Sequence, residues 1–451
     1  MSCPRCAHSN PSEASFCNAC GQPLAEAANS ISPRHRVVVT GMGVITALGP
    51  TVEETWHRLL AGETGIRRAD NLVAGEHACL IRGDVDSSRI PRRVLTGKVA
   101  RNASRFTHLV VEATADALLQ AGLIDPALEP TDDLSLSGAV VGTCMGGTHD
   151  DFLPAYDTYK EKGEGRIAPH LHVMFPHNLA TYNIQARWGM GGPSLTLATA
   201  CATGAQAIGH AFHDVRDGRA PVMVAAAVES TQHPMFTSGF AAMRALPTDS
   251  NDDPGAASRP FDATRAGFVL GEGAAALVLE SLEHATARGA TILAEVLGFA
   301  TSNDAYHPIA PIPEGTGAAR AIAAALADAN LPPAAVDHVN AHAASTPAGD
   351  LAEAAAIKRV FGERAASIPV TSIKGAVGHC MAASGAIETV AAVMTLIDQK
   401  IPPTRNYRTP DPEIGLDIVH GEPRETDIAV VSKHSFGLGG QNACLILARP
   451  A

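Results

Sequence analysis

The stretch PSLTLATACATGAQAIGHAFHDVRDG, residues 193–218, changes its pattern once, at a single cysteine. Apolar and polar residues alternate before it, as in a β-strand, and apolar residues recur at helical spacing after it until Gly218. Cys201 therefore lies on a strand-to-helix corner, where the helix dipole and free amides favour the thiolate and lower the thiol pKa. Small neighbours leave room for a carbonyl substrate. For this stretch alone, a buried structural cysteine is an equal alternative.

Strand and helix patterns alternate on both sides of this corner. VVVTGMGVITALG, residues 37–49, predicts a buried strand and a glycine-rich turn, and residues 51–62 predict a capped helix. Residues 221–230 form a continuous apolar run, typical of a strand inside a sheet. Residues 266–281 predict two adjacent strands, and paired strands surround SFGLGG, residues 435–440. This alternation predicts an α/β protein with largely parallel sheets.

Size and charge exclude several classes of protein. With 451 residues the chain is too long for one small core, and its net charge of −12 argues against coating nucleic acid or an anionic membrane. We find no run of about 18 continuous apolar residues that would cross a bilayer. The first thirty residues lack the layout of a signal peptide. We therefore expect a cytoplasmic protein.

The first twenty residues contain four of the nine cysteines, in two CxxC pairs separated by ten residues. Four thiolates at this spacing provide tetrahedral zinc coordination, and the metal would supply the folding energy of so short a segment. The alternative is a tail of unligated thiols. We predict a zinc ribbon over residues 1–24 and a linker over residues 25–35, with the ligands Cys3, Cys6, Cys17 and Cys20.

Three further loops carry chemically useful side chains. His342 follows an apolar strand and precedes a helix that begins at Pro347, so it faces the crevice at the strand's carboxyl end. Lys374 and His379 lie on a glycine-rich turn before another helix. Three glycines follow Phe436 within four residues, which lets backbone amides approach an oxyanion. Each loop taken alone also fits a purely structural role.

Taken together, these loops and several long segments resemble the β-ketoacyl-acyl carrier protein synthases of the elongating type, within the thiolase superfamily. The likeness runs from about residue 36 to residue 450 and includes VVVTGMGVITALG, TACATG, SNDAYH, NAHAASTPAGDLAE, KGAVGH and SFGLGG. It implies a thiolase-like, five-layered αβαβα fold of two similar halves. We place the nucleophile half at residues 36–292 and the histidine half at residues 293–451.

The resemblance also implies roles for individual residues. Cys201 takes an acyl group from a carrier thioester, and the backbone amides of Cys201 and Phe436 form an oxyanion hole. His342 and His379 hold the carbonyl of a malonyl-type extender and stabilise the enolate formed as carbon dioxide leaves. Lys374 orients the histidines, and Phe436 is a gate that moves when acyl chains load. Catalysis needs no cofactor, and phosphopantetheine enters on the carrier protein.

Other positions are assigned to support, the acyl pocket and the carrier. Glu353 supports the histidine network, while Met145 and Phe240 line the acyl pocket, where the long Met145 favours a short or medium chain. Because the carrier is acidic, its docking needs local positive charge; an ordinary solvated helix face is the alternative for the basic segment. The predicted carrier-binding residues are Arg92, Arg93, Lys98, Arg101, Arg105, Arg244 and Thr346.

Four positions depart from the family pattern. Ala343 and Ala344 replace the glycine and threonine that usually follow the first histidine, and Ile309 replaces a threonine after SNDAYH. Hydroxyls at these positions usually bond the phosphopantetheine arm, and Thr346 alone remains of that set. His434 replaces the asparagine that usually precedes SFG. These changes put recognition of the arm, rather than the catalytic residues, in question.

The sequence therefore favours a condensing enzyme of fatty acid or polyketide biosynthesis, acting on acyl and malonyl thioesters of an acyl carrier protein. Two alternatives stay open: a Cys-dependent acyltransferase that lacks condensation, and a non-catalytic assembly subunit that docks through the zinc ribbon. We expect a homodimer, with a heterodimer of related subunits as the alternative, and no nucleic acid or membrane partner.

Overall fold

The computed structural model describes residues 34–450, so the predicted zinc ribbon lies outside the described residues. Its centre is an 11-stranded sheet in the order β12-β10-β9-β14-β15-β8-β1-β7-β6-β4-β5. In chain order these strands are β1 (Val37–Thr46), β4 (Gly138–Gly142), β5 (Ser194–Leu197), β6 (Val222–Glu229), β7 (Gly273–Ser281), β8 (Ala294–Asn303), β9 (His338–Asn340), β10 (Pro369–Thr371), β12 (Asp417–Ile418), β14 (Val430–Gly437) and β15 (Gln441–Ala448).

Helices surround and divide this sheet, and two short strand pairs lie outside it. The helices are α1 (Val52–Leu60), α2 (Gly97–Arg101), α3 (Arg105–Ala121), α4 (Leu153–Lys162), α5 (Asn178–Trp188), α6 (Thr203–Arg216), α7 (Pro234–Ala242), α8 (Leu282–Ala287), α9 (Thr316–Asp328), α10 (Pro347–Phe361), α11 (Lys374–Val377) and α12 (Ser384–Asp398). The strand pairs are β2 (Arg67–Arg68) with β3 (Ile81–Arg82), and β11 (Lys400–Ile401) with β13 (Arg424–Glu425).

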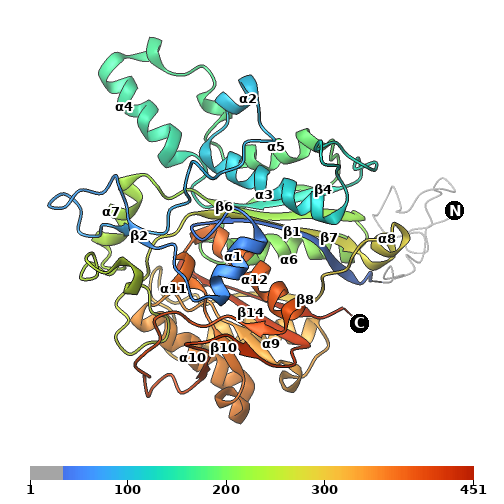
Figure 1. Ribbon diagram of the computed structural model, residues 1–451, viewed down its shortest axis with the longest axis vertical. Helices are drawn as coiled ribbons and strands as arrows, with labels where there is room; N and C mark the ends of the chain where they lie inside the picture. Colours follow the sequence, from blue (N-terminus) through green and yellow to red (C-terminus); the bar gives the residue numbers. More distant parts are fainter. Residues whose placement is uncertain (1–33, 451) are drawn as a thin grey trace, which may run out of the picture.

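Alternating side chains on the strands divide the core into layers. On β6, Met223 and Ala225 pack in one apolar cluster with α6 and α12, whereas Val224 packs with α3 and α5. On β15, Leu445 joins the α6 and α12 cluster, whereas Ile446 packs with α9 and α10. Helices α6 and α12 therefore lie between the two halves of the sheet, with a helical layer outside each half (Figure 1). This confirms the predicted five-layered αβαβα fold.

Strand directions correct the prediction of largely parallel sheets. Strand β4 pairs parallel with β5 and β6, and β9 pairs parallel with β10 and β14. Strands β1, β7, β8 and β15 join these groups through antiparallel pairs. Residues 266–281 provide one strand rather than two, since before β7 they contribute only isolated bridges at Leu270 and Gly271. The sheet is mixed.

Gly41 and Gly43 lie inside β1, where helix α3 crosses directly over the strand, and only Gly49 lies in the turn that follows it. A Cβ at Gly43 would lie 1.9 Å from the carbonyl oxygen of Ala113, and one at Gly41 would lie 2.0 Å from that of Ala117. These contacts are closer than any side chain tolerates. Glycine is required here for backbone packing between the strand and α3.

We expect Gly43→Ala to lower the free energy of unfolding by about 1–3 kcal/mol or more, since α3 must move away from β1. The midpoint of urea unfolding measures this effect. Gly165→Ala is the matched control, because a Cβ at Gly165 meets nothing within 4 Å. Equal midpoints for the two variants would contradict the packing argument.

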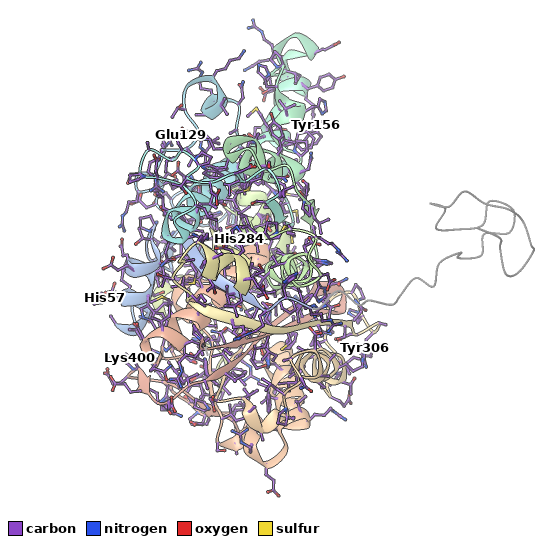
Figure 2. The ribbon with its side chains drawn as sticks, turned by 90° about the vertical axis from the view of Figure 1, so that its right-hand side faces the viewer. His57, Glu129, Tyr156, His284, Tyr306 and Lys400 are labelled. Atoms are coloured by element: carbon purple, nitrogen blue, oxygen red, sulfur yellow. The ribbon has the colours of Figure 1, made fainter. Side chains whose placement is uncertain are left out.

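Helix α12 is apolar enough to resemble a membrane span. The segment Met381–Asp398 has a mean hydropathy of 1.4 over 18 residues, and 83% of it is buried inside the protein. It packs between the two halves of the sheet, so its apolar character belongs to the core. By contrast, α4 extends beyond the layered body, as the position of Tyr156 shows (Figure 2).

Candidate active site

The predicted strand-to-helix corner at Cys201 is present and strained. Strand β5 ends at Leu197, α6 begins at Thr203, and Cys201 lies between them with 5% of its surface exposed. Ala200 adopts a left-handed φ of 50°, which costs free energy for a residue with a side chain. The Thr203 hydroxyl donates to the carbonyl of Ala200 over 2.6 Å and accepts from the amide of Thr199 over 2.7 Å. These bonds hold the corner that presents the sulfur.

Two imidazoles from the other half of the chain meet this sulfur. The Nε2 atom of His379 lies 3.0 Å from the Sγ atom of Cys201, although the residues are 178 positions apart. The rings of His342 and His379 are 5.3 Å apart and nearly perpendicular. One ligand-type atom from each of the three residues lies within 4.8 Å of the others. The structure thus brings the three predicted side chains together.

The Nζ atom of Lys374 contacts two atoms of His342. Its ammonium donates to the carbonyl oxygen of His342 and lies 3.4 Å from the ring Nδ1, which can accept. An ammonium group has donors only, so this contact places the ring proton on Nε2. His342 therefore presents an N–H donor toward the sulfur, as an oxyanion-binding role requires.

His379 has a partner that serves either tautomer. Its Nδ1 lies 2.9 Å from the hydroxyl of Ser384, which can donate or accept. The Nε2 atom facing Cys201 can therefore be the protonated or the free nitrogen. Burial holds the pKa values of His342 and His379 well below the ordinary range, and the charge of Lys374 lowers them further. Both rings are neutral at neutral pH.

The pKa of Cys201 differs in direction from the sequence-based expectation. Burial raises it to about 11, while Lys374 and two backbone amides lower it by less. The groups that lower the pKa are Lys374 and the amides of Leu438 and Cys201, and removal of the sulfur from water is the larger effect. The resting group is therefore a thiol beside a neutral imidazole that can accept its proton.

We expect the rate of alkylation of Cys201 by iodoacetamide to rise about tenfold per pH unit between pH 7 and pH 9, in proportion to the thiolate fraction. The raised pKa makes the thiolate a minor species throughout this range. The rate is measured by mass spectrometry of the peptide that contains Cys201. A plateau near pH 8.5, the ordinary pKa of about 8.5 for a free cysteine, would contradict the raised pKa.

The glycine loop contributes an amide that was not predicted. The backbone N–H groups of Leu438 and of Cys201 itself both lower the pKa of the Cys201 thiol, which places them near its sulfur. Phe436 is two residues earlier, within β14, and its ring lies 6.1 Å from that of His342. Leu438 is therefore a further amide from this loop near the sulfur, and the oxyanion role of the Cys201 and Phe436 amides stays a prediction.

A cavity of about 420 Å³ opens onto Cys201, His342 and His379. Met145, predicted to line the acyl pocket, is not among the residues that line this cavity and packs against the apolar cluster that includes Cys201. Two of the positions that depart from the family pattern, Ala344 and Ile309, face this cavity. Other predicted residues that line it are Phe240, Arg244, Thr346, Glu353 and Phe436.

Glu353 holds the backbone that carries His342. One carboxylate oxygen accepts from the amide of His342 over 2.9 Å, and the other accepts from the amide of Ala343 over 2.6 Å. The Nδ1 atom of His434 lies 3.1 Å from the first of these oxygens. His434 thus contacts the support of the catalytic loop rather than the cavity.

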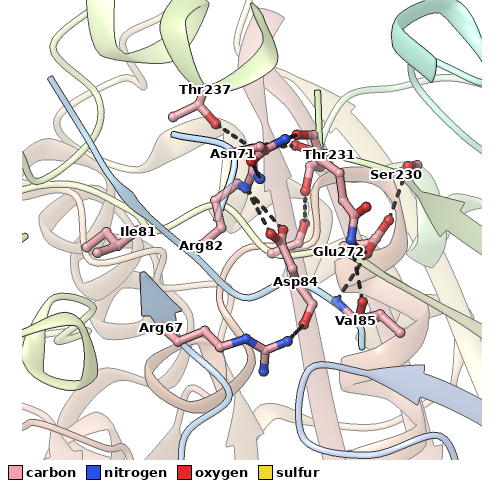
Figure 3. A network of polar contacts seen from close by, with 12 residues as sticks. Arg67, Asn71, Ile81, Arg82, Asp84, Val85, Ser230, Thr231, Thr237 and Glu272 are labelled. Atoms are coloured by element: carbon pink, nitrogen blue, oxygen red, sulfur yellow. Dashed lines mark hydrogen bonds and ion pairs between the residues drawn. The ribbon is translucent and has the colours of Figure 1, made fainter. Parts of the chain in front are cut away.

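Some of the arginines predicted to bind the carrier form ion pairs with acidic residues of the protein itself. Arg105 is bound by Glu272 over 2.6 Å and is 20% exposed; Glu272 also accepts from Ser230 and from the amide of Val85 (Figure 3). Arg93 is paired with acidic groups of α3. These ion pairs engage Arg93 and Arg105 within the protein, and their contact with a carrier stays a prediction. The exposed residues of the set are Arg92, Arg93, Lys98, Arg101 and Arg244; of these, Arg93 is ion-paired and Arg244 lies at the cavity.

Sequence reasoning missed four residues of the site: Ser384, Glu388, Lys433 and Leu438. Ser384 and Glu388 lie on α12, whose composition suggests a plain core helix. The signal for Lys433 was available, because a lysine inside the apolar strand VVSKHSFG needs a buried anionic partner. That partner is Glu388, at 2.8 Å.

Comparison with known protein families identifies the group to which this arrangement belongs. A family model described as Beta-ketoacyl synthase, N-terminal domain, matches residues 34–285, and one described as Beta-ketoacyl synthase, C-terminal domain, matches residues 293–408. The chain belongs to the β-ketoacyl synthase family. It is a condensing enzyme of the acyltransferase class.

Individual β-ketoacyl synthases are similar over nearly the whole chain. The 3-oxoacyl-[acyl-carrier-protein] synthase 2 of Synechocystis sp. is 42% identical over 413 residues, which cover 91% of this chain and 97% of that protein. The synthase 2 of Staphylococcus aureus is 40% identical, covering 93% and 99%. A type II polyketide ketosynthase, solved with its acyl-carrier protein and bound to the hexaketide, has a TM-score of 0.84 at 32% identity, covering 92% of this chain and 100% of that chain.

Proposed function

We propose that this β-ketoacyl synthase joins an acyl group, held as a thioester on Cys201, to a malonyl-type extender carried by an acyl carrier protein. The observation that carries the proposal is the meeting of one sulfur and two neutral imidazoles at the end of a cavity. A soft nucleophile holds the acyl group, and N–H donors stabilise negative charge that develops on an oxygen.

In the first half-reaction, the Cys201 sulfur attacks the carbonyl carbon of the acyl-carrier thioester. His379 accepts the thiol proton at Nε2, 3.0 Å away, and returns it to the carrier thiolate as that group leaves. The oxyanion of the tetrahedral intermediate lies against the amides of Cys201 and Phe436, and the Leu438 amide is near the sulfur. The products are acyl-Cys201 and the free carrier thiol.

In the second half-reaction, the thioester oxygen of the extender accepts from the Nε2–H groups of His342 and His379. The bond to the carboxylate carbon breaks, carbon dioxide leaves, and the electron pair forms an enolate that these donors stabilise. The Ser384 hydroxyl allows His379 to hold its proton on Nε2 in this step. The enolate carbon attacks acyl-Cys201, and the cysteine thiolate leaves from a β-ketoacyl-carrier product.

The cavity supports delivery by a phosphopantetheine arm with fewer hydrogen bonds than usual. Ala344 and Ile309 provide apolar surface along the channel, and Thr346 provides the remaining hydroxyl. Arg244, exposed at the cavity, is the basic residue best placed to meet an acidic carrier. We propose Phe436 as the gate, since its ring lies beside those of His342 and His434.

Incubation of the full chain with acyl-carrier and malonyl-carrier substrates, followed by mass spectrometry, tests the proposal. A β-ketoacyl-carrier product supports condensation. Acyl-Cys201 without a new carbon–carbon bond supports the alternative of an acyltransferase, and absence of both supports a non-catalytic subunit. Acyl chains of increasing length, offered in competition, distinguish a fatty acid role from the polyketide role of the structural relative.

The four N-terminal cysteines are proposed to bind one zinc ion, on the support of their spacing. We expect about one zinc per chain by elemental analysis, and loss of that zinc in the variant carrying Cys3→Ser and Cys6→Ser. Condensation should persist in this variant, because the active-site cysteine is Cys201. A zinc-free wild-type chain purified under reducing conditions would refute the ribbon.

We also propose a cytoplasmic homodimer. Strand β5 lies at the sheet edge with Ser194 and Leu195 exposed, and α4 exposes Tyr156 and Tyr159. An open edge strand and exposed aromatic side chains support contact with a second chain. Light scattering of the purified protein distinguishes a dimer from a monomer, and co-purification with a related subunit would favour a heterodimer.

A further inference from the structure

A second buried ammonium group lies close to the catalytic histidines. Lys433, on β14, is fully buried, and its Nζ atom is surrounded by three oxygen atoms. It lies 2.8 Å from Oε2 of Glu388, donates to the carbonyl oxygen of His434 over 2.7 Å, and donates to the hydroxyl of Ser435. Two of these contacts are hydrogen bonds and the third is an ion pair, and Lys433 is not among the residues that line the cavity.

Glu388 connects this ammonium to the catalytic loop. Its Oε2 atom binds Lys433, and its Oε1 atom binds Lys374, the residue that contacts His342. Glu388, Lys374 and Lys433 are all at most 2% exposed, so the ion pairs act with little screening by solvent. The contacts form one continuous path, from Lys433 through Glu388 and Lys374 to His342.

We propose that Lys433 is a positioning residue for the decarboxylation half-reaction, an inference that rests on the proposed function of His342. By occupying one oxygen of Glu388, Lys433 leaves only the other oxygen for Lys374. The Lys374 ammonium therefore keeps donors for the carbonyl and Nδ1 of His342. Without Lys433, both oxygens of Glu388 would compete for Lys374, and the contact that places the His342 proton on Nε2 would weaken.

The charge of Lys433 acts in the same direction. The pKa values of His342 and His379 are lowered chiefly by burial and by Lys374, and the charge of Lys433 lowers both further. Neutral imidazoles with a proton on Nε2 are the form that donates to the extender carbonyl. Lys433 thus favours the reactive form without touching substrate.

Lys433→Met tests the role, because it keeps the length of the side chain and removes its charge. We expect carbon dioxide release from malonyl-carrier to fall by about tenfold or more, measured as kcat, with a smaller change in KM. Acylation of Cys201 by an acyl-carrier should change by less than about threefold. Val431→Ala is the matched control, because Val431 lies on the same strand in the same core and, as an apolar side chain, forms no ion pair with Glu388.

Combining the substitution with Glu388→Gln shows whether Lys433 acts through Glu388, and it removes the unpaired carboxylate that could prevent folding. In that background Lys433→Met should have little further effect on carbon dioxide release. Equal effects in both backgrounds would overturn the proposal. In Lys433→Ala, ammonium chloride should restore activity saturably, whereas tetramethylammonium chloride at equal ionic strength should not.

These measurements test the proposed condensing function and the positioning role of Lys433 separately. A wild-type chain that releases no carbon dioxide from malonyl-carrier overturns the proposed function and the role of Lys433 together. A wild-type chain that does so, with Lys433→Met as active as Val431→Ala, overturns only the role of Lys433. Loss of Cys201 acylation to the same extent as decarboxylation would likewise show general damage rather than positioning.

Discussion

Cys201→Ala will abolish formation of the β-ketoacyl product, with a loss on the order of 10³-fold or more in kcat/KM. The variant has no atom that can carry the acyl group, and no other sulfur replaces it. Of the other described cysteines, Cys79, Cys380 and Cys444 are buried, and the sulfur of the half-buried Cys144 bonds to the carbonyl oxygen of Ala200, next to Cys201. Product formation by mass spectrometry measures the loss, and intact-protein mass shows whether any acyl group is attached.

The same variant should still release carbon dioxide from malonyl-carrier, because His342 and His379 remain in place. Cys444→Ala, which removes a buried sulfur from β15, is the matched control and should retain condensation. Acylation at a second cysteine in Cys201→Ala, with product still formed, would contradict the assignment of the nucleophile. Loss of all activity in Cys444→Ala would mean that core packing, rather than chemistry, explains both results.

His342→Ala and His379→Ala should differ in which half-reaction they damage. The Nε2 atom of His379 lies 3.0 Å from the Cys201 sulfur, whereas the ring of His342 lies beside the ring of His379. We expect His342→Ala to lower decarboxylation by about 10²- to 10³-fold and to leave acylation of Cys201 within a few-fold of wild type. His379→Ala should lower both half-reactions, with acylation down by about 10²-fold. Single-turnover acylation and carbon dioxide release measure the two steps separately.

A buried histidine away from the site provides the control for these variants. His338 lies on β9, is fully buried, and bonds to the carbonyl oxygen of Pro369 rather than to any residue of the cavity. His338→Gln should alter stability more than either half-reaction. If His342→Ala and His379→Ala lost the two steps in equal proportion, the division of labour between the rings would be refuted.

Much of the fold follows from local sequence patterns. The helix predicted to begin at Pro347 does so, and the paired strands around SFGLGG are β14 and β15. The glycines of β1 were placed in a turn because local preference cannot show that α3 crosses the strand at Ala113. Glycine within a strand often marks such a close approach, so the signal was present but its cause lay 70 residues away.

The sequence predicted which side chains form the candidate site, but it did not predict all the contacts among them. Cys201, His342, Lys374 and His379 each follow a strand or a glycine turn, positions where side chains reach a crevice. Leu438 was missed because which backbone amides approach the sulfur depends on how the glycine loop turns after β14. Residue type carries no information about that turn, since every amide is chemically alike.

The sequence by itself determined the layered fold, the family and the four side chains that meet at the cavity, because periodicity and motif order are local properties that survive without coordinates. Only the tertiary structure decided that Cys201 is a high-pKa thiol, that Arg105 is occupied by Glu272, and that Lys433 shares Glu388 with Lys374. Burial and electrostatic energy depend on distances between groups far apart in the chain. Those distances exist only once the two halves have packed together.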